Sequence, residues 1–153
     1  MPAAPRRYGM VSCQLAPRFE NLLREVAAGI PVIVLRVYGV WPVSIWHYAV
    51  VAGYDYPSGE LVLRSGEKEW LSIPFVVFEY TWKESGYWAM VTMPSDRIPV
   101  TATESGYLAA IVAMERVGNA RGATLAYTTF LGRWLTTLWR ASGWQTDITY
   151  WGN

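Results

Sequence analysis

Residues 44–66, SIWHYAVVAGYDYPSGELVLRSG, carry the clearest structural pattern in the chain. Two runs rich in β-branched and aromatic residues, 45–54 and 60–65, stand on either side of the segment DYPSGE. Tight turns prefer Asp, Pro, Ser and Gly, so the pattern predicts two antiparallel strands joined by a hairpin turn. The first strand contains His47, the single histidine of the 153-residue chain. An imidazole in an apolar strand suggests one half of a catalytic pair, and a core histidine bonded to backbone or hydroxyl groups is the alternative.

The sequence around the hairpin predicts further strands and helices. Residues 17–29 carry apolar side chains at helical spacing, with Pro17 able to open a helix and Gly29 able to end it. Residues 30–40, IPVIVLRVYGV, are apolar on both faces, which is typical of a central strand. Short strands are expected at 10–15, 68–73 and 87–93, and a short helix at 74–84. Together these elements predict an α+β fold in which a helix leads into an antiparallel sheet.

The composition changes after Pro94. Residues 95–103 are mostly small or polar, which is typical of a linker. Beyond them the strand pattern disappears, and two alanine-rich helical segments meet at Gly118-Asn119. A third helical segment is expected at 136–151. The sequence therefore predicts a first part at 1–94, a linker at 95–103 and a helical part at 104–153.

The helical part shows a repeat period. Gly118-Asn119 and Gly152-Asn153 are 34 residues apart, which is the period of tetratricopeptide repeats. That frame places its packing residues at Tyr107, Ala123, Tyr127 and Phe130. It departs from the usual pattern at Ile111, at Leu135 where a terminating proline is usual, and at Gln145. We expect about one and a half tetratricopeptide-like repeats, with a generic helical hairpin as the alternative.

Composition excludes several classes of protein. Thirteen basic and twelve acidic residues leave a net charge of +1, so there is no basic surface for nucleic acid. One cysteine and one histidine exclude a disulfide framework and are too few for a structural zinc site, and we expect no metal and no cofactor. The basic start Arg6-Arg7 has no apolar segment behind it, so it is not a signal peptide. The apolar run 29–54 is interrupted by Arg36, His47 and two prolines, which argues against a membrane-spanning helix.

The series PVIVL…HYAVVAGYD…VLRSG…W…YWAMVTMP resembles, as a set, the bacteriocin-processing (double-glycine leader) type of papain-like cysteine peptidases. More specifically, it resembles the bacterial branch with tetratricopeptide repeats appended. The resemblance covers most of the chain. It implies a papain-like peptidase β-half followed by a tetratricopeptide-like hairpin, the hydrolysis of peptide bonds, and a peptide or protein partner. Members of this family are often exported or envelope-associated, and the compartment of this chain stays unassigned.

The resemblance also implies roles for single residues. His47 takes the place of the general base that accepts a proton from a cysteine thiol. The acid that orients this base usually begins an Asp-Pro pair after the hairpin, and Ser65 takes that position here. A serine hydroxyl can accept a hydrogen bond from imidazole but cannot stabilise imidazolium with a full charge. Asp55 is the nearest carboxylate in the sequence, but its place at the turn favours a structural role facing solvent.

The nucleophile is the part that the sequence does not supply. In papain-like enzymes it follows a glutamine and begins a helix, whereas Cys13, the single cysteine, precedes Gln14 and lies in a strand-like run. No helix starts at Cys13 to lower the pKa of its thiol, so we interpret it as a small buried hydrophobic residue. We therefore expect a truncated, catalytically incomplete peptidase-like chain, with Met1 as an internal methionine or an artificial start. The alternatives are a non-enzymatic interaction module that binds through its helices and a membrane-embedded protein.

Overall fold

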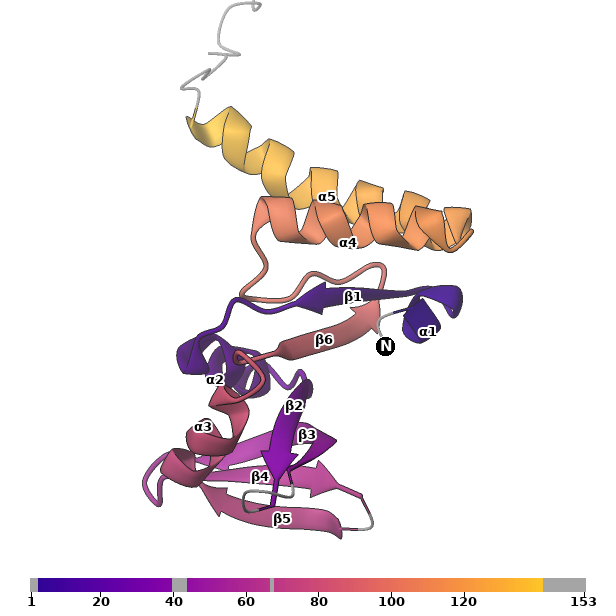
Figure 1. Ribbon diagram of the computed structural model, residues 1–153. Coiled ribbons are helices and arrows are strands. Elements are labelled where there is room, and N and C mark those ends of the chain that lie inside the picture. Colours follow the sequence, from indigo (N-terminus) through magenta and orange to yellow (C-terminus); the bar gives the residue numbers. More distant parts are fainter. Residues whose placement is uncertain (1–2, 40–43, 67, 142–153) are drawn as a thin grey trace, which may run out of the picture.

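The computed structural model describes residues 3–39, 44–66 and 68–141, and Figure 1 shows how they are arranged. Within these residues six strands form one sheet of order β1-β6-β2-β3-β4-β5, and all neighbouring strands are antiparallel. The strands are β1 (Met10–Gln14), β2 (Val32–Tyr38), β3 (Ile45–Asp55), β4 (Glu60–Ser65), β5 (Lys68–Pro74) and β6 (Ala89–Pro94). The helices are α1 (Ala3–Arg7), α2 (Phe19–Ala27), α3 (Phe75–Lys83), α4 (Glu104–Arg116) and α5 (Ala120–Ala141). The expected α+β fold with an antiparallel sheet is confirmed.

Helix α2 follows directly from its amphipathic sequence. Leu22 and Val26 are buried on one side of it together with Glu25. At its end Gly29 has a φ of +76°, the left-handed conformation that glycine adopts without strain. The amide of Gly29 donates to the carbonyl of Val26 and the amide of Ile30 to that of Glu25, each at 3.0 Å. This is the bonding pattern of the Schellman motif, so the helix and its glycine stop are as the sequence predicts.

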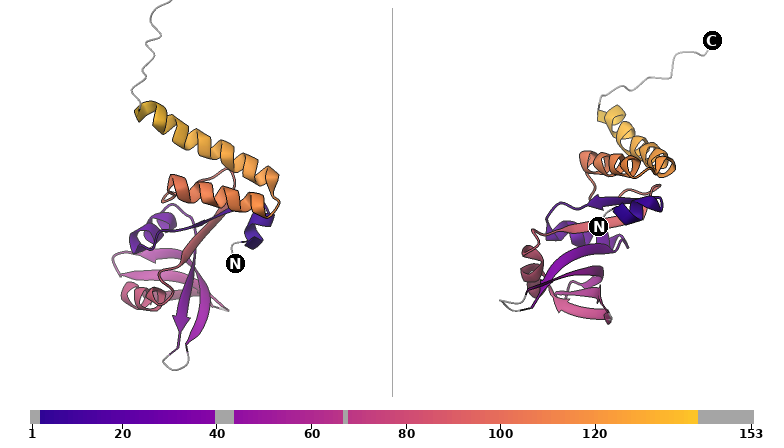
Figure 2. Two further views of the ribbon diagram at one scale, coloured as in Figure 1. Left: turned by 45° about the horizontal axis from the view of Figure 1, so that its top comes forward. Right: turned by 45° about the vertical axis from the view of Figure 1, so that its right-hand side comes forward.

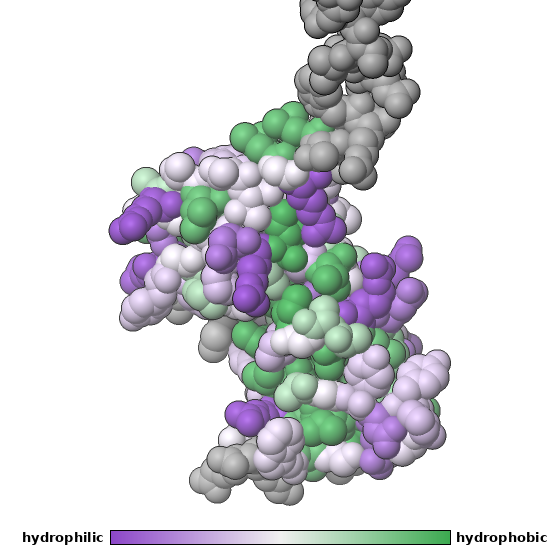
Figure 3. All heavy atoms as spheres, turned by 180° about the vertical axis from the view of Figure 1, so that it is seen from behind, coloured by the Kyte–Doolittle hydropathy of each residue, from purple (hydrophilic) through white to green (hydrophobic). Residues whose placement is uncertain are grey.

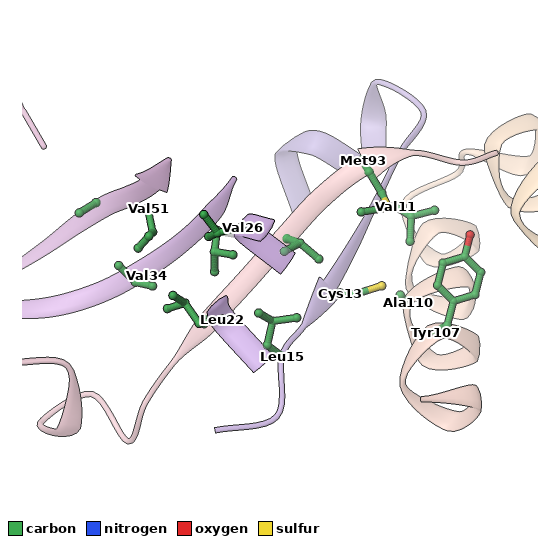
Figure 4. Packing of buried hydrophobic residues seen from close by; sticks show 14 of the residues in the cluster. Val11, Cys13, Leu15, Leu22, Val26, Val34, Val51, Met93, Tyr107 and Ala110 are labelled. Atoms are coloured by element: carbon green, nitrogen blue, oxygen red, sulfur yellow. The ribbon is translucent and has the colours of Figure 1, made fainter. Parts of the chain in front are cut away.

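Strands β2 and β3 lie in the interior of the sheet, and their register positions the histidine. Arg36 stands directly opposite His47, and opposed residues of antiparallel strands point to the same face. That face also carries the buried side chain of Val34, and Figure 4 shows α2 residues packed beside it. Alternate residues point to the other face, where Trp46 and Tyr48 are exposed by 55% and 38%.

One hydrophobic cluster extends from the sheet into α4 and α5. Val11 and Cys13 of β1 pack beneath Tyr107 and Ala110 of α4, and Figure 4 shows the sulfur of Cys13 directed toward that helix. Figures 1 and 2 show the two helices beside β1, at the end of the sheet away from β5. The described residues of α4 and α5 therefore share a core with the sheet.

Residues 95–103 are held in place by several hydrogen bonds. The carboxylate of Glu25 accepts hydrogen bonds from the amide of Val100 at 3.3 Å, and from the amide and hydroxyl of Thr101 at 2.7 and 2.6 Å. The Tyr107 hydroxyl donates to the carbonyl of Arg97 at 3.0 Å. The segment between the sheet and α4 is thus bonded both to α2 and to α4.

Helices α4 and α5 form an antiparallel hairpin around the turn at Gly118-Asn119. The side chain of Asn119 caps α5 by accepting a hydrogen bond from the amide of Gly122 at 2.9 Å. A Cβ at Gly122 would lie 2.6 Å from Met114 Cε, so this glycine allows the two helices to approach closely. Tyr107 stacks on Phe130 with ring centroids 6.5 Å apart.

The end of the hairpin differs from the expected repeat. Helix α5 continues without interruption through Leu135 to Ala141, so no break separates a further segment at residue 136. The physical reason is local, because a leucine at position 135 continues a helix that a proline would have ended. The rest of the expected segment at 136–151 and Gln145 lie outside the described residues.

Candidate functional site

His47 lies near the start of β3, on the face of the sheet that α2 and α3 cover. Its ring meets the Tyr38 ring edge to face, with centroids 5.6 Å apart and an interplanar angle of 87°. The residue as a whole is half-buried, but its Nε2 atom is fully buried and has no hydrogen-bond partner. A buried imidazole nitrogen without a partner is unusual, since buried polar atoms are nearly always bonded.

Arg36, opposite His47, is buried with 1% of its surface exposed. Its Nε donates to the hydroxyl of Thr81 on α3 at 2.9 Å. The guanidinium carbon lies 5.2 Å from the ring centre of Tyr38 and 5.3 Å from that of Phe78, so the cation is held between two aromatic rings. Burial lowers the pKa of Arg36, whereas the charge interaction and the side-chain hydrogen bond with Tyr38 raise it. Its Nη1 atom is buried and has no hydrogen-bond partner.

Helix α3 places the partners of Arg36. Phe78 and Trp82 are the buried residues of this helix and fix it against the sheet. The hydroxyl of Thr81 lies within hydrogen-bond distance of the carbonyl of Phe78 at 2.9 Å and that of Val77 at 3.2 Å, so its oxygen is left to accept from Arg36. The position of the guanidinium is therefore set by α3.

The β4–β5 hairpin brings its turn next to the histidine. Gly66 has a φ of +60°, and a Cβ built on it would lie 3.9 Å from His47 Cε1. Ser65 is half-buried, at a point where the pairing of β4 with β5 shifts register. Among the described contacts no hydrogen bond joins the Ser65 hydroxyl to His47. The hairpin thus brings residue 66 beside the ring, and no carboxylate accompanies it within the described residues.

Asp55 lies at the far end of β3 from His47. The two are eight residues apart on one strand, which corresponds to about 26 Å at the usual rise of a strand. The carboxylate is exposed, and the backbone carbonyl of Asp55 accepts a hydrogen bond from the Ser58 hydroxyl in the turn. The structure does not bring Asp55 to the histidine.

Cys13 lies on β1, and strands β6 and β2 separate it from β3. Three strand spacings amount to about 14 Å, so the thiol is far beyond hydrogen-bond reach of His47. The side chain is 4% exposed, and burial raises the pKa of the Cys13 thiol to about 12, with a further increase from Glu25 and a smaller decrease from Arg6. At neutral pH only about one thiol in 10⁵ is then ionised. Cys13 and His47 do not form a catalytic pair in this geometry.

The described residues contain neither a metal centre nor a membrane span. No group of three or more His, Cys, Asp and Glu side chains among them is placed to hold a metal ion. None of the helices in the described part of the chain is both long and apolar enough to cross a bilayer.

Three residues at this site were not assigned a role from the sequence: Arg36, Tyr38 and Gly66. A signal for Arg36 is present, because it continues the inward-facing alternation of Val32 and Val34 and is the one charged residue in that strand. Tyr38 follows in the same alternation. The contact with Gly66 depends on the pairing of strands, which no local pattern indicates.

Comparison with known proteins gives one finding about overall structure. No family model and no curated protein matches the chain. The crystal structure of a Bacillus anthracis protein described as a C39-like peptidase is similar, with 21% sequence identity and a TM-score of 0.43. The similarity covers 54% of this chain and 50% of that one, so the chain matches about half the length of that structure.

Proposed function

We propose that this chain is the base-bearing part of a cysteine-peptidase-like protein and that it is catalytically incomplete by itself. His47 acts as the general base, and the thiol that it serves comes from polypeptide outside these 153 residues. The observation that carries the proposal is the unpartnered Nε2 atom of His47. A histidine with a purely structural role would have this nitrogen bonded to a backbone or hydroxyl group.

The proposed chemistry is the transfer of a proton from a thiol to the imidazole, after which the thiolate attacks a peptide carbonyl. The imidazolium formed in this step needs stabilisation, which a carboxylate usually supplies. Ser65 and Gly66 occupy the hairpin end where that acid belongs, so the unassisted base is expected to be weak. Without the thiolate and the donors that stabilise an oxyanion, His47 has no nucleophile to activate.

A fluorogenic peptide assay tests the claim of incompleteness. The wild-type chain, His47→Ala and Cys13→Ala are expected to show the same turnover as buffer. Cys13 is buried, un-ionised and three strands away, so removing it should change nothing. Turnover by the wild-type chain that disappears in both variants would overturn the claim.

A second candidate function is binding to a protein through the α4–α5 hairpin, which includes the tetratricopeptide-like interpretation. The observation that favours it is a set of leucines exposed by 39–48% on these helices: Leu108, Leu125, Leu131 and Leu135. Helical repeats need stacked neighbours to bury such faces. Deleting the helices would uncover the core at Tyr107, so Leu131→Glu combined with Leu135→Glu is the better test. This double variant should lose a co-purifying protein that the wild-type chain retains, and retention by the double variant would exclude binding through these leucines.

A further inference from the structure

Arg36 is a buried cation that lacks a counter-ion within the described residues. Its contacts there are the Thr81 and Tyr38 hydroxyls and two ring faces, none of them a negative charge at neutral pH, and Nη1 has no hydrogen-bond partner. Arginine is almost never fully buried without an ionic partner, since taking the charge out of water is costly. Guanidinium also stays protonated in proteins, so it cannot escape this cost by losing its proton. A bound anion would therefore supply the negative charge that this buried guanidinium lacks.

A second unpartnered donor lies beside it. Arg36 and His47 are directly opposed across β2 and β3, so their side chains lie on one face with Cβ atoms about 5 Å apart. Both contact the same Tyr38 ring, at 5.2 Å for the guanidinium carbon and 5.6 Å for the imidazole centre. The buried nitrogens Nη1 of Arg36 and Nε2 of His47 are both without partners. With its proton on Nε2, His47 donates from a position adjacent to a fixed positive charge.

We propose that Arg36 and His47 together form a binding site for a carboxylate group. A carboxylate supplies the missing negative charge, and its two oxygens can accept from both nitrogens at once. In a polypeptide ligand the group is either a C-terminal carboxylate or the side chain of an acidic residue. The proposal concerns binding alone, and a carboxylate bonded to Nε2 would occupy the atom of the proposed base, so the two roles exclude each other while the carboxylate is bound.

Gly66 borders the site, so a side chain introduced at this position can test whether the site accepts a carboxylate. The Cβ of a residue at this position would be in ordinary van der Waals contact with His47 Cε1, at 3.9 Å. Asp and Asn tolerate the positive φ of position 66 better than other residues with side chains. Gly66→Asp would therefore place a carboxylate at the imidazole, and Gly66→Asn is its uncharged match.

The experiment uses the ring-proton NMR signals of His47, which are unambiguous because the chain has one histidine. The probes are sodium acetate, acetyl-trialanine with a free C-terminus, acetyl-Ala-Glu-Ala amide and acetyl-trialanine amide, all at constant ionic strength in sodium chloride. Acetate and at least one of the two carboxylate peptides should shift the His47 signals in a saturable way, and the neutral amide should not. The two peptides distinguish a C-terminal source from a side-chain source. A shift of equal size with the neutral amide or with chloride alone would overturn the proposal.

Two sets of variants make the result specific. Arg36→Met should abolish the saturable shift, whereas Arg36→Lys should weaken it, because the charge remains without the planar fork of donors. Should Arg36→Met not fold, the pair at position 66 decides: Gly66→Asp should no longer respond to acetate, and Gly66→Asn should still respond. Equal responses of that pair would contradict the proposal.

A further variant tests whether an acidic residue of this chain, the one next to Gly66 in the sequence, occupies the proposed site. Glu67 follows Gly66 and lies outside the described residues. A response to acetate in Glu67→Gln that is absent from the wild-type chain would show that the chain fills the site itself, which would overturn binding of an external carboxylate.

Discussion

Arg36 is a buried charge that three side chains contact. Its guanidinium carbon lies over both the Tyr38 and the Phe78 ring, and its Nε donates to Thr81. Replacing a buried charge with an apolar residue of similar length is often neutral or stabilising, whereas removing one partner of a buried charge is not. The two kinds of substitution should therefore have opposite consequences.

Arg36→Met should leave the free energy of unfolding within about 1 kcal/mol of the wild-type value or raise it. Thr81→Val keeps the shape of the side chain but removes the acceptor for Arg36 Nε, so it should cost about 1–3 kcal/mol. Thr81→Ser keeps the acceptor and is the control. Urea denaturation at pH 7 with an unchanged m-value measures all three. A larger loss for Arg36→Met than for Thr81→Val would mean that the guanidinium is there for stability.

Cys13 is a second single residue with a testable effect, because its buried thiol should make the stability of the folded chain depend on pH. Burial raises the pKa of its thiol from 9.0 to about 12 in the folded chain. The folded state therefore retains the thiol proton more strongly than the unfolded state does between these two values. The resulting stabilisation is fully present below pH 9 and is lost progressively as the pH rises toward 12.

Between pH 8 and pH 10, the wild-type chain should lose about 1.4 kcal/mol more stability than Cys13→Ala. The comparison of two chains cancels the constant cost of the alanine and the part of the Tyr107 contribution that burial causes. The pKa of Tyr107 is raised to about 12 first by burial and then by Cys13, and only the Cys13 part differs between the two chains. Urea denaturation of both chains at the two pH values measures the difference. Parallel pH profiles would show that the Cys13 thiol is not desolvated in the folded chain.

At the scale of elements, the sequence predicts most of the strands and helices but little of their pairing. Hydrophobic periodicity and the glycine at position 29 define α2, and the turn residues 55–60 define the β3–β4 hairpin. The pairing of β1 with β6 joins residues about 80 positions apart, as between Ser12 and Thr92, and no local pattern contains it. The proximity of Gly66 to His47 escapes sequence reasoning for the same reason.

Glu25 links two elements, α2 and the segment before α4, through three hydrogen bonds to Val100 and Thr101. Glu25→Gln replaces one acceptor oxygen with a donor that faces other donors, and should cost about 1.5–3 kcal/mol. Glu20→Gln in the exposed first turn of α2 is the matched control and should change stability by less than about 0.5 kcal/mol. Thermal unfolding followed by circular dichroism compares them. A similar Tm for both variants would show that the Glu25 contacts contribute little.

At the scale of the whole molecule, the helices cover one side of the sheet unevenly and leave aromatic surface elsewhere. Trp46 and Trp70 are exposed by 55% and 67%, and Figure 3 shows apolar residues gathered in a band across the sheet half of the molecule. Composition predicts that large rings fill a core or an interface. It does not predict which of them stay at the surface, since that depends on which strand faces the helices cover.

The prediction of function from sequence is also uneven. His47 stands out because it is the single histidine and lies in an apolar strand, and the structure places it at a site with unpartnered nitrogens. The roles of Ser65 and of His47 as an oriented base stay predictions. Arg36 is the residue whose role is least visible in the sequence, because there it interrupts an apolar run, whereas in the fold it stands directly opposite His47.

We propose that His47 can act as a base toward a thiol, and no thiol lies within its reach among the described residues. The most direct measurement introduces a thiol by Tyr38→Cys in a Cys13→Ala background, since Tyr38 is the ring neighbour of His47. Alkylation by iodoacetamide at pH 7 should then be about tenfold faster than in the same chain carrying His47→Gln, because a neighbouring imidazole increases the thiolate fraction. Equal alkylation rates with and without His47 would contradict the account.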